Sequence, residues 1–184
     1  VGSDGKREYQ KYANTQVRLM GYFRSGNNLE WNASLGMKQD RTYKYGYEPQ
    51  TLVFSPDSLK QQFQTISGRV GFHNINKTDF GLTYSPDVKI DVFSDNHDNS
   101  ESNTVVNLPL EKTIGKEFAV NLGLTFDLTR VSPKGKAAIN NTMYYISPSV
   151  LYKTGNINVQ AGIRPSWDNK TFKMFPNILA DISS

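Results

Sequence analysis

The residues of this chain best suited to acid–base chemistry are its two histidines, His73 and His97. A catalytic histidine needs a nucleophile and an orienting partner within hydrogen-bond reach. No Gly-x-Ser-x-Gly turn, the local signature of one large class of serine hydrolases, occurs in the sequence. We therefore expect no catalytic residue and no enzyme activity. A Ser-His-Asp group is assembled in space, however, so a barrel enzyme that acts on lipid stays open as an alternative.

A segment rich in carboxylate and amide oxygens runs from Asp95 through Asp98 to Glu101. Such oxygens are the ligands that Ca²⁺ prefers, but the EF-hand spacing and its glycine are absent. The chain has no cysteine, which excludes thiolate metal sites and disulfides. It also has no phosphate-binding or dinucleotide-binding glycine motif. The sequence therefore predicts a solvated loop here, with no metal and no cofactor.

Other charged residues alternate with apolar ones, which is the arrangement expected on one face of a sheet. In a membrane barrel this face lines a polar lumen, whereas in a soluble sheet it meets solvent. We predict that the following residues face such a lumen: Arg69, His73, Asp87, Lys89, Asp91, Asp127 and Arg164.

The elements that must carry these residues are strands, because apolar residues recur at every second position. The clearest example is 80–92, where each even-numbered residue is apolar or proline. The same pattern predicts nine strands, at 17–23, 29–37, 66–72, 80–92, 106–114, 118–128, 144–152, 157–167 and 172–182. No stretch of about ten residues has helical periodicity. The predicted fold is all-β, an antiparallel up-and-down meander of eight or nine strands in a single domain over 1–184.

The predicted connections differ between the two ends of this meander. Tight turns rich in Gly and Asn are expected at 24–28, 74–77, 114–117 and 153–156, and longer polar joins at 40–59, 94–102 and 132–141, with a short last join at 168–170. Short turns at one end and longer loops at the other are typical of transmembrane β-barrels. The loop 40–59 would then select the ligand, and the basic turn 132–136 could meet lipopolysaccharide phosphates.

Charge and hydropathy exclude some classes of function and favour others. The net charge is only +4, and the charges are interspersed, so we expect no nucleic-acid partner. No apolar run approaches the roughly 20 residues of a membrane-spanning helix. Long two-faced strands instead favour a transmembrane β-barrel, or part of one, in the bacterial outer membrane. Aromatic residues near strand ends would form its interfacial belts, namely Tyr22, Trp31, Tyr144 and Trp167. The alternative is a soluble β-barrel or β-sandwich that binds a small ligand or a glycan.

Several short motifs resemble barrel strands of TonB-dependent-receptor-like outer-membrane proteins of Bacteroidota. They are Ile66-Ser-Gly-Arg-Val-Gly-Phe72, the strand 80–92, Ile146-Ser-Pro-Ser149, Ala161-Gly-Ile-Arg164 and Phe175-Pro-Asn-Ile178. The resemblance implies the barrel wall of a receptor, transporter or pore. Its partners would be the lipid bilayer and lipopolysaccharide. The predicted strand count is odd, and the last strand alternates to its end. We therefore expect further partners, which would be the remaining strands of a larger barrel or other outer-membrane subunits. No TonB box, plug domain or closing C-terminal aromatic is recognisable, so coupled uptake is not implied.

Overall fold

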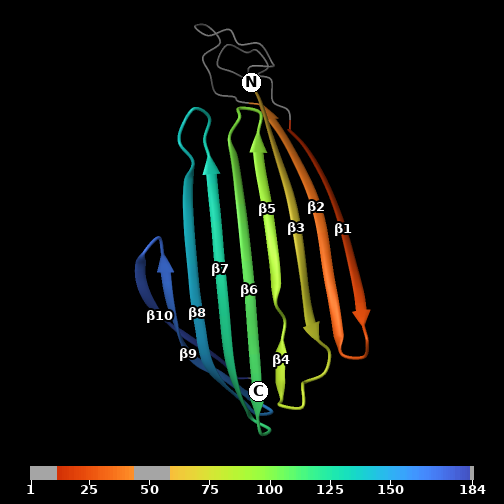
Figure 1. Cartoon of the computed structure of the whole chain (residues 1–184), viewed down its shortest axis with the longest axis vertical. Helices are drawn as coiled ribbons and strands as arrows, with labels where there is room; N and C mark the ends of the chain where they lie inside the picture. Colours follow the sequence, from red (N-terminus) through yellow and green to blue (C-terminus); the bar gives the residue numbers. More distant parts are fainter. Residues whose placement is uncertain (1–11, 44–58, 183–184) are drawn as a thin grey trace.

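The structure, a computed structural model, describes residues 12–43 and 59–182, and these residues form one antiparallel sheet of ten strands. Strands follow one another across the sheet in chain order (Figure 1). The predicted all-β up-and-down meander is therefore confirmed. The strands are β1 (Tyr12–Ser25), β2 (Leu29–Tyr43), β3 (Lys60–Asn74), β4 (Leu82–Tyr84), β5 (Asp87–Asp95), β6 (Ser100–Ile114), β7 (Phe118–Ser132), β8 (Ile139–Lys153), β9 (Ile157–Asp168) and β10 (Thr171–Ile182).

The short strand β4 and its successor β5 are two parts of one pass across the sheet. Both pair with β6 in a continuous register, in which Tyr84 lies opposite Leu110 and Asp87 lies opposite Asn107. The interruption falls at Pro86, which has no backbone N–H to donate to a ladder. The ten strands thus make nine passes, and these coincide with the nine segments predicted from alternation.

The side chain of Asn74 bridges the place where β3 and β4 do not pair. Its Nδ2 donates to the carbonyls of Asn76 (2.8 Å) and Leu82 (2.9 Å), and its Oδ1 accepts from the backbone N–H of Tyr84 (2.8 Å). The residue is only 3% exposed. One amide side chain thus satisfies backbone groups that a continuous ladder would otherwise pair.

Connections differ in length less than the sequence predicted. At one end the turns are 26–28, 75–81, 115–117 and 154–156; at the other, the described turns are 96–99, 133–138 and 169–170. The predicted long join 94–102 is wrong, because β5 and β6 extend into it and leave four residues. Polar residues on both faces of this part of β6 hid its strand character. Most of the predicted ligand-selecting loop 40–59 lies outside the described residues.

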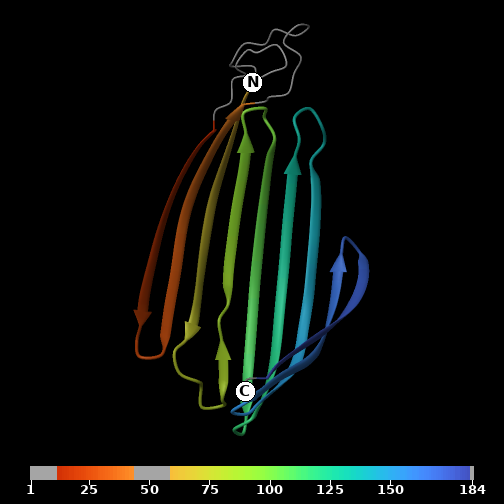
Figure 2. The same cartoon turned by 180° about the vertical axis from the view of Figure 1, so that it is seen from behind.

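The sheet is open within the described part of the chain. β1 pairs only with β2, and β10 pairs only with β9. Seen from either side, β9 and β10 run obliquely to β6, β7 and β8, while β1 forms the opposite margin (Figures 1 and 2). Two long strand edges therefore keep unpaired backbone groups among the described residues.

No buried apolar layer covers either face of the sheet. No large side chain among the described residues is fully buried, and many apolar residues are more than a third exposed. Helical spans able to cross a membrane do not occur in 12–43 or 59–182. The sheet thus presents two distinct surfaces, which cross-strand pairing identifies residue by residue.

Candidate functional site

Cross-strand pairing places all seven predicted lumen candidates on one face, which we call the polar face. Glu30 lies opposite His73 on β2 and β3, and Arg69 lies opposite Lys89 on β3 and β5. One row crosses all nine passes on this face. Its members are Tyr22, Asn32, Gly71, Asp87, Asn107, Thr125, Tyr145, Ser166 and Lys173. The other candidates, Asp91, Asp127 and Arg164, belong to neighbouring rows on this face.

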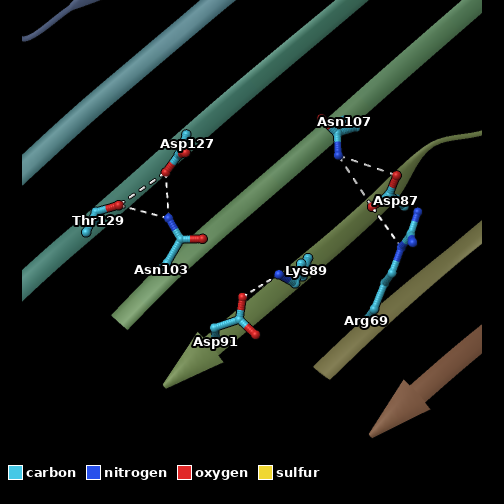
Figure 3. A network of polar contacts seen from close by, with 8 residues as sticks. All are labelled: Arg69, Asp87, Lys89, Asp91, Asn103, Asn107, Asp127 and Thr129. Atoms are coloured by element: carbon cyan, nitrogen blue, oxygen red, sulfur yellow. Dashed lines mark hydrogen bonds and ion pairs between the residues drawn. The ribbon is translucent and has the colours of Figure 1, made fainter. Parts of the chain in front are cut away.

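A chain of polar contacts joins β3 to β7 along this row, and Figure 3 shows its part from Arg69 to Asn107. The Arg69 guanidinium Nε lies 3.2 Å from Asp87 Oδ2, and Asn107 Nδ2 approaches the same carboxylate at 3.5 Å. The Thr125 hydroxyl then donates to Asn107 Oδ1 at 2.9 Å. Four side chains from four strands therefore share one connected contact path.

Two further contact groups continue the network on the same face (Figure 3). Asn103 Nδ2 donates to Asp127 Oδ1 (2.6 Å) and to Thr129 Oγ1 (2.8 Å). Lys89 Nζ lies 2.7 Å from Asp91 Oδ2 along β5. Acidic and basic groups are thus mostly paired within the network. Such an arrangement suits a hydrated polar surface and contains no free nucleophile–base pair.

Two hollows on the polar face each span several strands. One, of about 420 Å³, is lined from β4 to β10; among its residues are Glu111, Asn121, Ser149, Arg164 and Asn177. Another, of about 500 Å³, is lined from β1 to β5 and includes Arg18, Tyr22, Arg69, Lys89 and Asp91. Side chains from non-adjacent strands border both spaces, and each is several times larger than the hollow of about 110 Å³ on the other face beside Trp31, Val88 and Leu108. The polar face is therefore the concave side of a curved sheet.

Glycine contacts show the same curvature. A Cβ added to Gly162 on the polar face would lie 2.5 Å from Ser149 Cβ and still closer to the Pro148 carbonyl. A Cβ added to Gly68 on the other face would have no atom within 4 Å. Opposite Cβ atoms in a flat antiparallel pair are about 4.5–5.5 Å apart. Strands β8 and β9 are therefore tightly bent toward the polar side.

Neither histidine belongs to a recognisable catalytic group in the described part of the chain. His73 Nε2 lies 3.8 Å from Glu30 Oε1, with no serine in that contact. His97 Nε2 is buried without a hydrogen-bond partner in the described structure. Among the described residues, no serine or carboxylate is hydrogen-bonded to this nitrogen, so the structure assembles no nucleophile–base pair there.

The carboxylates of the turn after β5 are occupied by protein groups. Asp95 accepts hydrogen bonds from the backbone N–H groups of His97 and Asn99 and from Asn99 Nδ2, at 2.8–2.9 Å. Asp98 instead pairs with Lys134 Nζ at 2.9 Å, and that hydrogen bond raises the pKa of the Lys134 ammonium. No group of three metal-ligating side chains occurs in the ranges 12–43 and 59–182.

The opposite face, which we call the apolar face, carries three of the four predicted interfacial aromatics. Trp31 lies 4.6 Å from Phe72 between ring centroids, and Trp167 lies 5.1 Å from Tyr144. The fourth residue, Tyr22, lies on the polar face opposite Asn32. Its place one residue before Phe23 puts it on the other side of β1, as strand alternation requires.

On β7 and β8, aromatic residues of the apolar face form two bands, one at the start of β7 and the end of β8 and the other five or six residues from the opposite strand ends. Strands β7 and β8 contribute to both bands: Phe118 packs on Tyr152 (4.9 Å), and Phe126 packs on Tyr144 (6.3 Å). The residues between the bands on these strands are Val120, Leu122, Leu124, Ile146, Pro148 and Val150. The bands are about 26 Å apart along the strand, from a rise of about 3.3 Å per residue.

Charge is confined to the ends of the apolar face. Within the described strands its charged residues are Arg41, Lys60, Lys112 and Arg130, each within two residues of a strand end. The polar face, in contrast, carries Asp87, Lys89 and Asp91 in the middle of the pass formed by β4 and β5 together, residues 82–95. Charged groups are therefore absent from the central zone of one face and concentrated in that of the other.

Sequence reasoning missed several members of the polar network. Asn103, Asn107 and Thr125 were absent from the candidates because they carry no charge. The predicted strand 106–114 also omitted the first part of β6, where Ser102 and Thr104 weaken the alternation on the apolar face. The available signal was the position of Asn103 and Asn107 at odd numbers in one segment, and of Thr125 and Asp127 at odd numbers in the next.

No protein-family model matches the chain, and no curated protein matches it.

Proposed function

We propose that this chain forms part of the wall of an outer-membrane β-barrel, a receptor, transporter or pore. The apolar face would contact lipid, and the polar face would line a hydrated lumen. This role agrees with the resemblance of the strand motifs to TonB-dependent-receptor-like barrels. Loops at one end of the strands would select the ligand, and the barrel would act by enclosing a passage rather than by catalysis.

The observation that carries this proposal is the relation between curvature and polarity. The larger hollows and the crowded Gly162 lie on the polar side, so the convex side is apolar and uncovered. A soluble barrel that binds an apolar ligand requires the reverse, with apolar residues inside. A transmembrane barrel requires an apolar exterior and accepts a polar interior.

The aromatic bands on the apolar face support the same role. Outer-membrane barrels carry an apolar belt about 25 Å tall between two aromatic girdles. The 26 Å spacing along the strands becomes about 20 Å across the membrane at a tilt of about 40°. Lys112 and Arg130 lie near the strand ends, where a cationic side chain at the lipid boundary costs little.

Tryptophan fluorescence in lipid vesicles tests the proposal directly, because the chain has only two tryptophans. Trp31 is the third residue of β2 and Trp167 is the last but one of β9, so the two reporters lie near opposite ends of their strands. Trp31→Phe and Trp167→Phe each leave a single reporter. Lipids brominated near the headgroup should quench each reporter more strongly than lipids brominated at the chain end. Water-soluble iodide should quench both only weakly.

The matching biochemical test is gel migration of outer-membrane fractions, unboiled and boiled. A barrel that resists SDS until heated should give two band positions. Recovery only in the soluble fraction, together with equal iodide quenching of both tryptophans, would contradict the membrane role. That result would favour the soluble alternative that binds a small ligand or a glycan.

A further inference from the structure

The outer edges of β1 and β10 share an orientation that restricts what can pair with them. Each neighbouring pair of passes from β1 to β10 is antiparallel, and eight such steps separate the first pass from the last. An even number of reversals leaves β1 and β10 running in the same direction. These two strands therefore cannot close the sheet on each other with the antiparallel pairing used throughout it.

Among the described strands, the large apolar side chains that are at least 65% exposed all lie on β1 or β10, and they occupy both faces. On β1, Leu19 is 66% exposed on the apolar face, and Met20 is 65% exposed on the polar face. On β10, Ile178 is 72% exposed on the apolar face, and Leu179 is 57% exposed on the polar face. A strand placed alongside each edge would cover both side chains and pair the free backbone groups.

We infer that the edges of β1 and β10 bind a β-partner, which is an odd number of further strand passes from polypeptide outside β1–β10. Only an odd addition to nine passes gives an even total, and only an even total closes with antiparallel pairs throughout. The partner strands should be about as long as β1, which has 14 residues, and should alternate apolar and polar residues. Their inward side chains beside Met20 and Leu179 should be large and apolar.

A second copy of the chain does not meet this requirement, an exclusion that rests on the proposed function. All copies in one membrane share the same orientation. In that orientation β10 of one copy and β1 of the next run in parallel, as they do within one copy. An antiparallel pairing of β1 with β1 from a second copy would invert one copy across the bilayer.

Photo-cross-linking along β1 tests the partner and its direction. Benzoylphenylalanine would replace Arg18, Met20 or Tyr22, one at a time, in the protein within its membrane fraction. Mass spectrometry would then identify the cross-linked residue. If the β-partner is present, each two-residue step forward on β1 should move the cross-link two residues backward on one two-faced segment outside 12–182. Probes at Phe175 and Leu179 should give the same antiparallel progression along β10.

A probe at Ile90, inside the sheet, provides the control, because its opposite residues are Gly68 and Thr104. Cross-links from β1 to β10 that progress in the same direction would overturn the inference in favour of parallel closure. Cross-links between β1 strands of two copies, or no edge cross-links beside a positive Ile90 control, would also overturn it. Each of these failures can occur with both tryptophans at the membrane interface, so it is separable from failure of the membrane role.

Discussion

Gly68 and Gly162 occupy the interiors of strands β3 and β9, yet their surroundings differ completely. The Gly68 Cα faces open space on the apolar side, whereas Gly162 faces the backbone of β8 at close range on the polar side. In a bent sheet, neighbouring side chains converge on the concave side and spread apart on the convex side. The contrast shows that one sheet combines a crowded polar surface with an open apolar one.

Neighbouring strands are held together by different side-chain contacts on the two faces. On the polar face, hydrogen bonds such as Thr125 to Asn107 join neighbouring strands directly. On the apolar face, ring contacts such as Trp167 with Tyr144 do so, and the apolar side chains between the aromatic bands are half-buried or exposed. Substitutions that exchange these environments should therefore have unequal effects.

The largest difference is expected between two adjacent residues of β7. Leu122→Arg places a charge between the aromatic bands and should destabilise the membrane-inserted protein by about 2–4 kcal/mol. Asn121→Arg places the same charge on the polar face, opposite Glu111, and should be tolerated. The measurement is the yield of heat-modifiable protein in membranes and its unfolding by denaturant in lipid vesicles. Equal losses in the two variants would contradict the assignment of opposite environments.

A smaller effect is expected from adding one methyl group at the concave bend. Gly162→Ala forces β8 and β9 apart, because the new Cβ would overlap Ser149 and the Pro148 carbonyl. We expect a loss of about 1–3 kcal/mol in the free energy of unfolding, the usual range for overpacking. Gly68→Ala is the matched control and should leave that free energy nearly unchanged. Reversal of this order would mean that the sheet curves the other way.

A third test concerns the bridge between β3 and β4. Asn74→Ala removes the amide that binds the backbone at Leu82 and Tyr84, and should cost about 1–2 kcal/mol of stability. Hydrogen exchange measured by mass spectrometry should then accelerate in 82–84. Asn76→Ala is the control, since the described contacts of Asn76 use its backbone N–H and carbonyl. Similar exchange in both variants would argue against the side-chain bridge.

The smallest effect is expected at the exposed turn pair Lys134–Asp98. The hydrogen bond from Asp98 raises the pKa of Lys134 above its usual value of 10.5. The pair therefore stabilises the folded protein below the ordinary lysine pKa, and this contribution is lost as the pH rises through the raised value. Thermal unfolding of the native protein and of Lys134→Gln should differ slightly at pH 7 and converge once the pH has risen through the raised pKa of Lys134. A difference that grows with pH would have the wrong sign.

Alternation alone predicted the nine passes and the face of every charged candidate, because a two-residue period fixes both at once. It could not predict the break at Pro86 or the bridging role of Asn74, since both depend on contacts between strands. The misplaced boundary of β6 has a related cause: Ser102 and Thr104 are polar at positions on the apolar face. Tyr22 was assigned by its nearness to a strand end, a criterion that ignores which side of the strand it occupies.

The strictly sequential strand order also bears on how such a sheet can change during evolution. Each pass bonds only to its neighbours in the chain, so a two-strand hairpin can be duplicated or deleted without rewiring the remaining ladders. Every such event changes the number of passes by two. The number of passes in this unit therefore stays odd through any series of hairpin duplications or deletions, while the width of the sheet can vary.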